Sequence, residues 1–593
     1  MVFGKHVNKY YLKYSIFLLI GLASLVAVDY LQLVIPNIYQ MLINGINDGK
    51  VMYNGVETAF DINFLVDHIC LPMTGIILAI VLGRFLWRLM FFGTGIRVET
   101  DLRNRMFDNA KTLSREYYQK NKVGTLMSLF TNDLDTVQEC FGWGIMMLFD
   151  ALLLGVLAIS KMYRMDKILT LLSLIPMALL FASSTLVIRY MMKKWEIRQE
   201  AFSKLSDFAQ ETFSGLAVVK AFVKESLELM SFKKINVENE KANVAHTKVS
   251  VLMRIIVTLF VESVICVILG YGGYLVYQNK FNAGQLVEFI GYFTSIVWPI
   301  MAISDLIDMS SRGRASLKRI SKLLDAKADV VDEEGAVDLP EIKGEIEFRH
   351  LSFRYPDKET DSLHDVSFKI NAGEKIGIVG RTGSGKTTIV DLILRTYNVP
   401  RGTLFVDGHD VNDITIHSLR AGCAYVPQDN FLFSDTISNN IAFGVDEYTE
   451  DIVRNAAILS DIDSDISEFA SGYDTVLGER GVTVSGGQKQ RISIARALIK
   501  DASILILDDS VSAVDTKTEK NILDALDKTR AGKTTILIAH RISTIENMDK
   551  IIFIENGMVT AFGSHEELYE SSPNYKKTVD MQRLEEEGRK YNA

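Results

Sequence analysis

The chain has 593 residues, more than a single domain usually contains, so two or more domains are expected. Hydrophobic residues make up 48% of it and the mean hydropathy is +0.15, both high for a purely soluble protein. The formal net charge of −9 argues against bulk attraction to nucleic acid. Its four cysteines lack CxxC spacing, so they predict neither a zinc site nor a disulfide framework.

Apolar stretches recur through the first half of the chain and stop near Arg312. Lysines precede the first stretch and no small-residue cleavage site follows it, so we interpret the N-terminus as an uncleaved anchor. Each stretch has the roughly 20 residues that are needed to cross a bilayer. We place membrane-spanning helices near 15–43, 71–96, 142–161, 168–192, 251–277 and 285–306.

Positive charge indicates the orientation of these helices. The basic segments are the N-terminus, 97–122, 189–248 and 312–322, which fall on one side of a six-helix topology. The loop near 44–70 is acidic, which fits the outside, whereas the short basic connection 161–167 is a local exception. We therefore expect both termini to be cytoplasmic. The polar, helix-prone segments 97–141 and 193–250 are interpreted as cytoplasmic helix extensions.

Ionisable side chains inside membrane spans are costly and so indicate functional candidates. The candidates are Asp29, Arg84, Arg88, Asp150, Glu262, Asp305 and Asp308. Asp29 and Arg84 both lie about 20 Å from the outer ends of their helices, which suggests an ion pair; the alternative is that Arg84 and Arg88 snorkel to the interface. Asp305 and Asp308 share a helix face, either as a cation-attracting cavity wall or as ordinary solvated residues. Asp150 and Glu262 either bind substrate or hydrogen-bond to neighbouring helices.

The composition changes after Leu324, where the acidic segment Ala326–Glu345 has no long apolar run and is typical of a linker. From about Gly344, β-like runs alternate with helical ones, which predicts an α/β domain. The segment Ile346–Tyr355 is expected to form a pair of strands, and Ile376–Val379 a buried strand.

A glycine-rich loop follows that buried strand directly. Gly380–Thr387 matches the pattern G-x-x-x-x-G-K-[ST] of a phosphate-binding loop. Its glycines let backbone N–H groups wrap phosphates, and the helix that follows adds a favourable dipole. We expect Lys386 to reach the β- and γ-phosphates of a nucleotide and Thr387 to bind Mg²⁺.

Two further segments complete the pattern. Ile504–Leu507 predicts a second buried strand, and Asp508 at its end is placed to hold the Mg²⁺ shell. The loop Val484–Gln488 reads Val-Ser-Gly-Gly-Gln, which offers a hydroxyl and glycine N–H groups to an anion.

These motifs, in this order, resemble the ATP-hydrolysing domain of ABC (ATP-binding cassette) proteins. A membrane half followed by such a cassette resembles the ABC exporter half-transporters over nearly the whole chain. The resemblance implies a six-helix all-α transmembrane domain (1–322), a linker (323–343) and an α/β P-loop nucleotide-binding domain (344–593).

The resemblance also implies site residues. Tyr355 would stack on adenine, the signature loop Ser485–Gln488 would bind the γ-phosphate of ATP held by a second cassette, and Gly478–Gly481 would touch membrane-domain helices. The implied catalytic residues are Asp509, His540 and Gln428, and the implied Mg²⁺ contacts are Thr387, Gln428 and Asp508. The implied D-loop is Ser512–Asp515. The implied ATP contacts are Tyr355, Gly380, Arg381, Thr382, Gly383, Ser384, Gly385, Lys386, Thr387, Thr388, Ser485, Gly486, Gly487, Gln488 and Asp515.

Asp509 is the one departure from the family pattern, which usually has glutamate there to polarise the attacking water. Aspartate is one methylene shorter, so its carboxylate would lie about 1.5 Å further back, and a misplacement of about 1 Å can cost about 10²-fold in rate. The alternative is that Asp509 still serves as a weak base. The chain then resembles the degenerate-site subunit of heterodimeric bacterial multidrug exporters, in which a partner with a glutamate carries the fast site.

In the family two such chains pair and exchange their fourth and fifth helices, and short coupling helices contact the cassettes. By analogy we expect these near Gly124–Asp133 and Phe213–Phe222. The expected function is ATP-driven export of amphipathic drugs, with cationic drugs as one option, across a bacterial plasma membrane. The expected cofactors are ATP and Mg²⁺, and the expected partners are a second half-transporter, the lipid bilayer and the substrate, but no nucleic acid. A lipid flippase and a regulatory ATP-binding ABC protein are the alternatives.

Overall fold

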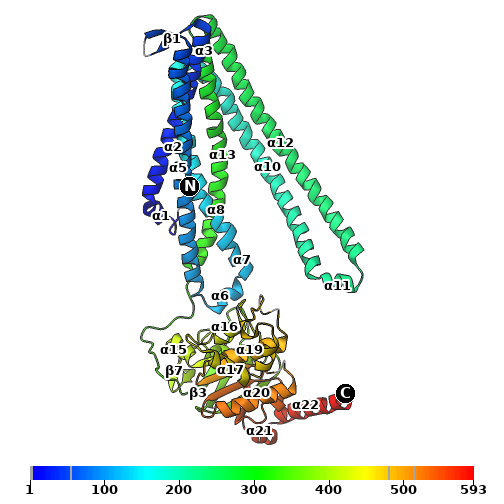
Figure 1. The fold of residues 1–593 in the computed structure, drawn as a ribbon. Helices are drawn as coiled ribbons and strands as arrows, with labels where there is room; N and C mark the ends of the chain where they lie inside the picture. The colour runs from blue at the N-terminus through cyan, green and yellow to red at the C-terminus, as the bar shows by residue number, and fades with distance from the viewer. Residues whose placement is uncertain (1–3, 54–55, 479–480, 482, 512–513, 593) are drawn as a thin grey trace. The chain divides into compact units, whose positions relative to one another are not determined.

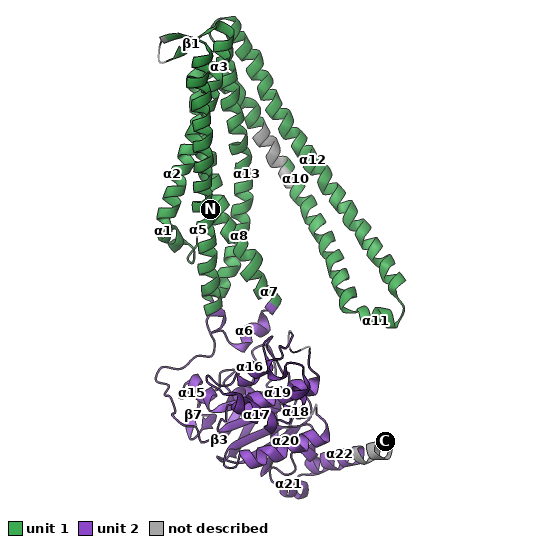
Figure 2. Ribbon diagram, in the orientation of Figure 1, with its two compact units in different colours: residues 1–108, 124–325 green, residues 109–123, 326–593 purple. Residues whose placement is uncertain are grey.

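The computed structural model divides the chain into two compact units (Figure 2). Unit 1 contains residues 1–108 and 124–325, and unit 2 contains residues 109–123 and 326–593. The structure describes all residues except 1–3, 54–55, 479–480, 482, 512–513 and 593; at 56, 180–186, 188–189, 304 and 586–592 it describes the backbone alone.

Unit 1 is built mainly from long helices (Figure 1). Its elements are α1 (Asn8–Lys13), α2 (Ser15–Gln32), α3 (Ile35–Asp48), the hairpin β1 (Lys50–Tyr53) and β2 (Val56–Ala59), α4 (Ile62–Phe64), the π-helix η1 (Leu65–Cys70), α5 (Leu71–Ala110), α7 (Val123–Ser128), η2 (Leu129–Asp133), α8 (Leu134–Glu139), η3 (Cys140–Gly144), α9 (Ile145–Met165), α10 (Lys167–Ser214), α11 (Leu216–Ala221), α12 (Glu225–Tyr277) and α13 (Ala283–Asp325).

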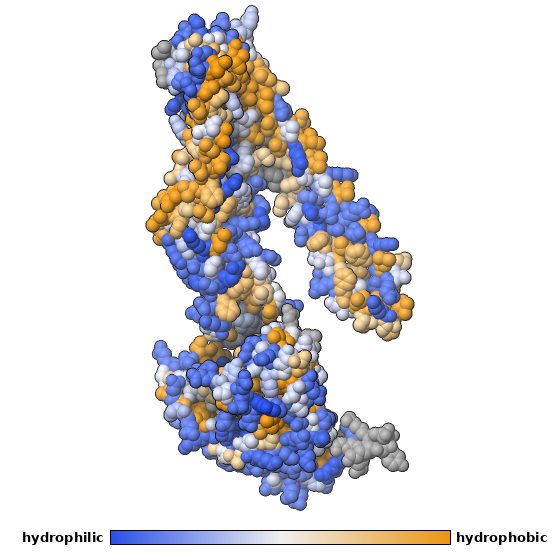
Figure 3. All heavy atoms as spheres, in the orientation of Figure 1, coloured by the Kyte–Doolittle hydropathy of each residue, from blue (hydrophilic) through white to orange (hydrophobic). Residues whose placement is uncertain are grey.

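Five helical segments among the described residues are long and apolar enough to cross a membrane. They are Ser15–Asp48, Ile62–Ala110, Val123–Met165, Glu225–Tyr277 and Ala283–Asp325. The expected span 168–192 lies within α10; its described part Lys167–Leu179 is apolar, and several side chains beyond it lie outside the description. Apolar side chains gather on the visible surface of unit 1, as expected for a surface that faces lipid (Figure 3).

The helices α10 and α12 run side by side and are joined by the short helix α11 (Figure 1). They have 48 and 53 residues, or roughly 70–80 Å at 1.5 Å per residue, much more than the roughly 30 Å of a bilayer core. Gly215 caps the C-terminus of α10 immediately before α11, so a separate short helix lies where the second coupling helix was expected.

The expected ion pair between Asp29 and Arg84 is not formed. Arg84 donates instead to Oε1 of Gln32, over 3.1 Å. Asp29 is buried, with 1% of its surface exposed, and its carboxyl lies against that of Asp150 on α9. The spacing of residues along two helices predicts how deep each residue lies in the membrane, but not which way its side chain points. The sequence therefore could not decide between these partners.

Another buried carboxylate holds η2 to α13. Arg319 donates to both oxygens of Asp133, with Nε 3.0 Å from Oδ2, and the hydroxyl of Ser316 donates to Oδ1 over 2.7 Å. Asp133 is only 7% exposed, and a buried carboxylate is stable only when it is paired and hydrogen-bonded. The two-pronged guanidinium contact meets this requirement.

Unit 2 contains two sheets and the helices around them. Its strands are β3 (Ile346–Phe353), β4 (Leu363–Ile370), β5 (Lys375–Gly380), β6 (Leu404–Val406), β7 (His409–Asp410), β8 (Cys423–Val426), β9 (Ile504–Asp508), β10 (Thr534–Ile538), β11 (Lys550–Glu555) and β12 (Met558–Gly563). Its helices are α6 (Arg115–Lys120), α14 (Lys386–Ile393), α15 (Ile416–Ala421), α16 (Ile437–Ala442), α17 (Glu450–Leu459), α18 (Asp463–Glu468), η4 (Gly472–Asp474), α19 (Gly486–Leu498), α20 (Thr516–Thr529), η6 (Ile542–Thr544), α21 (His565–Ser571) and α22 (Pro573–Asn592).

The larger sheet has the order β12-β11-β5-β10-β9-β8, in which β11, β5, β10, β9 and β8 are parallel and β12 is antiparallel. The smaller sheet, β4-β3-β6-β7, is antiparallel. The predicted fold class, an all-α domain with long apolar helices followed by an α/β P-loop domain, is confirmed. The predicted buried strands at 376–379 and 504–507 are β5 and β9.

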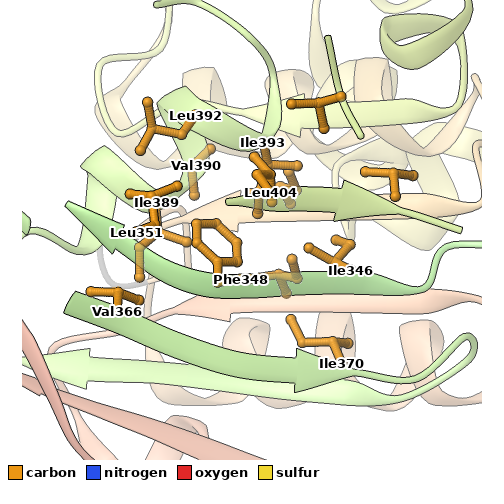
Figure 4. Packing of buried hydrophobic residues seen from close by; sticks show 14 of the residues in the cluster. Ile346, Phe348, Leu351, Val366, Ile370, Ile389, Val390, Leu392, Ile393 and Leu404 are labelled. Atoms are coloured by element: carbon orange, nitrogen blue, oxygen red, sulfur yellow. The ribbon is translucent and has the colours of Figure 1, made fainter. Parts of the chain in front are cut away.

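The expected pair of strands at Ile346–Tyr355 is wrong, because this segment forms the single strand β3. Its pairing with β4 shifts register between Phe348 and Leu351, where His350 has a φ of +47°. Such a bulge interrupts the alternation of side chains without ending the strand. Apolar side chains from both sides of the bulge pack with α14 in one core (Figure 4).

The Asp133 network leads to a prediction about stability. Arg319→Gln leaves the buried Asp133 carboxylate without its charge partner. Because the Arg319 side chain is itself 54% exposed, water can replace part of the contact, so we expect a loss of about 1–3 kcal/mol and a lower thermal unfolding midpoint in detergent. Arg312→Gln on the same helix is the matched control, because Arg312 pairs with Asp308 where both side chains are more than half exposed. Equal midpoints for the two variants would contradict this account of the network.

Candidate nucleotide-binding site

The predicted site residues meet at one edge of the larger sheet of unit 2. Parallel strands end at a common edge, and in open α/β sheets ligands bind beside the carboxyl ends of the strands. Four neighbouring strands contribute: the loop Gly380–Thr387 follows β5, Asp508 ends β9, His540 follows β10, and Gln428 follows β8.

The glycine-rich loop has the backbone that its sequence predicts. Gly385 has a φ of +103° at the N-cap of α14, a conformation that side chains rarely allow. Lys386 donates through Nζ to the carbonyls of Gly380 (2.8 Å) and Arg381 (3.0 Å), so its ammonium lies against the loop where phosphates would bind. Burial lowers the pKa of Lys386, whereas the carboxylates of Asp509 and Asp508 oppose this shift.

Asp508 fits a magnesium ion. It is 2% exposed, and its Oδ2 has no hydrogen-bond partner among the described residues. Burial raises the pKa of Asp508; the Thr387 hydroxyl opposes this, and the neighbouring Asp509 charge adds to it. A bound cation would favour the charged carboxylate, and hydroxyl and carboxylate oxygens suit Mg²⁺. Thr387 and Asp508 therefore form a donor set suited to this ion, with Gln428 beside them in the same cavity.

Asp509 lies between the other two predicted catalytic residues. Its Oδ2 is 3.5 Å from Nε2 of Gln428 and 3.7 Å from Nε2 of His540. Its backbone N–H donates to the carbonyl of Ile538 on β10 over 3.0 Å, and its φ is +47°. The structure thus brings Asp509, His540 and Gln428 together at the end of β9.

All these groups face one open cavity of about 360 Å³. The predicted residues that line it are Tyr355, Thr382, Gly383, Gly385, Lys386, Thr387, Thr388, Gln428, Asp508, Asp509 and His540. Sequence reasoning missed seven further lining residues: Arg115, Gln119, Asp357, Lys358, Ser362, Asp391 and Ile538.

Arg115 and Gln119 reach the cavity from α6, in the short segment 109–123 that belongs to unit 2. The first coupling helix was expected at Gly124–Asp133, but that stretch forms parts of α7 and η2 in unit 1. The segment 109–123, which belongs to unit 2, therefore lies upstream of the place expected for the first coupling helix. No motif marks Arg115, because its partner Asp391 is 276 residues away.

Tyr355, the expected adenine-stacking residue, has its hydroxyl 3.0 Å from Oγ1 of Thr388. Its ring makes edge-to-face contacts with Phe353 and Tyr397, with centroids 5.1 Å apart in both cases. The Nζ of Lys358 lies 5.3 Å from the ring centroid. The ring is thus held by two T-shaped contacts and lies at the wall of the cavity.

The signature loop Ser485–Gln488 does not line this cavity. Ser485 caps α19 through a reciprocal pair of hydrogen bonds with Gln488, and Gly486 opens the first turn. Asp515 caps α20 instead of reaching the cavity. Residues 479–480 of the expected Gly478–Gly481 loop and 512–513 of the D-loop lie outside the described residues.

Comparison with known proteins agrees with this geometry. Two family models match the chain: that of the ABC transporter transmembrane region at residues 18–300 and that of the ABC transporter at residues 363–512. The chain is 35% identical over 582 residues to the probable multidrug resistance ABC transporter ATP-binding/permease protein YheI of Bacillus subtilis, covering 98% of this chain and 97% of the relative. It is also 35% identical over 519 residues to the ATP-dependent lipid A-core flippase of Syntrophus aciditrophicus, covering 86% and 85%.

A solved structure of a bacterial Atm1-family ABC exporter with ATP bound covers 97% of this chain and 98% of its own, with a TM-score of 0.76 and 26% identity. The match spans both the transmembrane helices and the P-loop unit. The chain belongs to the ABC transporter family, as an ATP-hydrolysing exporter with a multi-pass transmembrane domain before its nucleotide-binding domain.

Proposed function

We propose that this chain is one subunit of a heterodimeric ABC exporter, in which it supplies a slow ATP site and completes a fast site on its partner. The observation that carries this proposal is the position of Asp509. Gln428 and His540 flank its carboxylate, which supports a catalytic set in which only the reach of the acid is reduced. A base that stops short of the attacking water would hold ATP and turn it over slowly.

The signature loop supports the second part of the proposal. It lies outside this chain's own cavity, at the N-terminus of the 13-residue helix α19. The first N–H groups of a helix have no partner within the helix and attract anions. The exposed Gly486 thus offers backbone N–H groups to the γ-phosphate of ATP on a second chain.

The long pair α10 and α12 supports pairing with another half-transporter. Few residues of the apolar window of α12 are buried within unit 1, so most of this helix is free to contact another chain or lipid. In this arrangement the bilayer surrounds unit 1, with both termini and unit 2 in the cytoplasm of a bacterial cell. Mg²⁺ at Asp508 and Thr387 would neutralise charge on the ATP phosphates.

The substrate we propose is amphipathic, with cationic drugs included. Two cavities are lined by α9 and α13. One is mostly apolar, at about 370 Å³, with Leu152 and Ile307 among its lining residues. The other, about 440 Å³, pairs the rings of Phe92 and Trp143 with three carboxylates and a single guanidinium, those of Glu139, Asp305, Asp308 and Arg312. Aromatic faces and an excess of negative charge suit an organic cation.

The first prediction concerns the chain in isolation. Purified alone in detergent it should show weak ATPase activity, and together with the half-transporter that copurifies with it the activity should rise at least tenfold, because the fast site needs a partner's glutamate. Strong turnover by the lone chain at matched protein concentration would rule out the heterodimer proposal.

The second prediction concerns Asp509. In the purified complex, Asp509→Glu should raise ATPase activity, by up to about 10²-fold at this site, because the longer side chain restores the reach of the carboxylate. Asp509→Asn is the control, and it should bring no rise because it lacks a base. If the glutamate variant leaves the rate unchanged, Asp509 is not the limiting group.

The third prediction concerns the acidic cavity. Asp305→Asn should raise the KM for transport of a permanently cationic dye severalfold in proteoliposomes, and it should leave the KM for a neutral dye of similar size unchanged. The neutral dye controls for misfolding of unit 1. An equal change for both dyes would remove Asp305 from cation recognition.

A lipid flippase is the second candidate, favoured by the similarity to a relative that is named as one. Lipids also need an apolar cavity, and the cavity beside Leu152 and Ile307 offers one. Flux of labelled lipid and of dye, measured in the same proteoliposomes, separates the two. ATP-dependent lipid flux without dye flux would favour the flippase.

A further inference from the structure

The buried carboxylate of Asp391 lies near the end of α14. Arg115 donates through Nη1 to Oδ1 over 2.6 Å, whereas the Thr396 hydroxyl donates to the backbone carbonyl of Asp391 over 2.6 Å. The Tyr355 hydroxyl donates to Oδ2 over 3.3 Å. Asp391 is 3% exposed, so these contacts replace the water it would otherwise bind.

Arg115 supplies a positive charge that opposes the effect of burial on this carboxylate. Burial raises the pKa of Asp391, and the charge of Arg115 is the largest effect that opposes it. A buried acid that loses its partner becomes protonated or draws in water, and either change alters its hydrogen bonds. The geometry of Asp391 therefore depends on a residue of α6.

Tyr355 depends on Asp391 in turn. Its ring makes T-shaped contacts with Phe353 and Tyr397, and its hydroxyl is held by Asp391 and Thr388. The hydroxyl oxygen lies on the rotation axis of χ2, so anchoring it fixes the position and direction of the ring axis, while the two ring contacts limit rotation about that axis. A base that stacks on this ring meets a surface whose position Asp391 helps to define.

We propose that Arg115 is a positioning residue for the adenine of ATP, acting through Asp391 and Tyr355, and that it sets affinity for the base and not for the phosphates. This inference rests on the proposed ATP site and names a specificity element of that site. The placement along α14 supports it. Asp391 is five residues after Lys386, about 7.5 Å along the helix, so the Arg115 contact is separated from the phosphate-binding end.

Direct contact between Arg115 and the nucleotide is the competing explanation, because Arg115 also lines the cavity. A ligand that has phosphates and no base detects a direct contact with the phosphates, and removal of the Asp391 charge detects a direct contact with the base. The probes are therefore MgATP and magnesium tripolyphosphate, each displacing a fluorescent ATP analogue from the purified full-length complex.

For Arg115→Gln we expect ATP affinity to fall about tenfold, the effect of losing one charge-assisted contact, while tripolyphosphate affinity stays within twofold of the wild type. Arg115→Lys should recover part of the loss, because it keeps the charge without the planar fork. Arg401→Gln is the matched control: Arg401 pairs with Glu333 and Asp413 on the surface of the same unit, and its loss should change neither affinity.

A double-mutant cycle with Asp391→Asn completes the test. Without the buried charge, Arg115 has nothing to hold, so Arg115→Gln in that background should cost less than twofold in ATP affinity. Any of three results would overturn the proposal that Arg115 acts through Asp391 and Tyr355. They are a full tenfold loss of ATP affinity in the Asp391→Asn background, an equal loss of affinity for ATP and tripolyphosphate, and no loss of ATP affinity for Arg115→Gln alone. Failure of the wild-type complex to bind ATP would instead overturn the proposed site itself.

Discussion

The close approach of β5 and β11 determines which residue can begin the loop between β5 and α14. A Cβ atom at Gly380 would lie 2.2 Å from the carbonyl oxygen of Ile554 on β11, so only glycine fits at the end of β5. This packing fixes where the loop begins, at the end of β5. Lys386 and Thr387 then follow at the start of α14, and the rest of the site lies on the neighbouring strands.

A buried carboxylate needs a charge partner or hydrogen bonds to replace lost water, and the carboxylates of the two units meet this requirement in different ways. Asp133 is held by Arg319, and Asp391 by Arg115. Asp508 is buried as deeply, yet its Oδ2 has no partner among the described residues. An unpaired buried oxygen costs free energy unless a cation joins it. The contrast supports the proposal that Asp508 holds Mg²⁺, whereas Asp133 and Asp391 each bind an arginine.

Features encoded by neighbouring residues were predicted from the sequence, whereas contacts between residues far apart in the chain were missed. Gly380–Thr387 and Ile504–Asp508 carry their own turn and strand signals, so the loop, both strands and the meeting of Asp508, Asp509, Gln428 and His540 followed from pattern and family resemblance. Arg115 carries no such signal, because only the folded chain brings α6 beside α14. Asp29 was assigned the wrong partner for the same reason: hydropathy gives the depth of a residue in a helix, and packing gives its direction.

The backbone at Asp509 explains how the two sites of an exporter could diverge at little cost to the fold. Its φ is +47°, and its backbone N–H donates to the carbonyl of Ile538 directly after β9. Aspartate is among the residues that adopt this conformation most readily, and glutamate would be the more strained occupant. Replacing one acid by the other therefore changes the reach of a carboxylate by one methylene and leaves the strands, the loop and the metal-binding residues where they are. A change of acid at this position therefore acts on the reach of the carboxylate and on local backbone strain, while the ATP-binding residues and the signature loop keep their places.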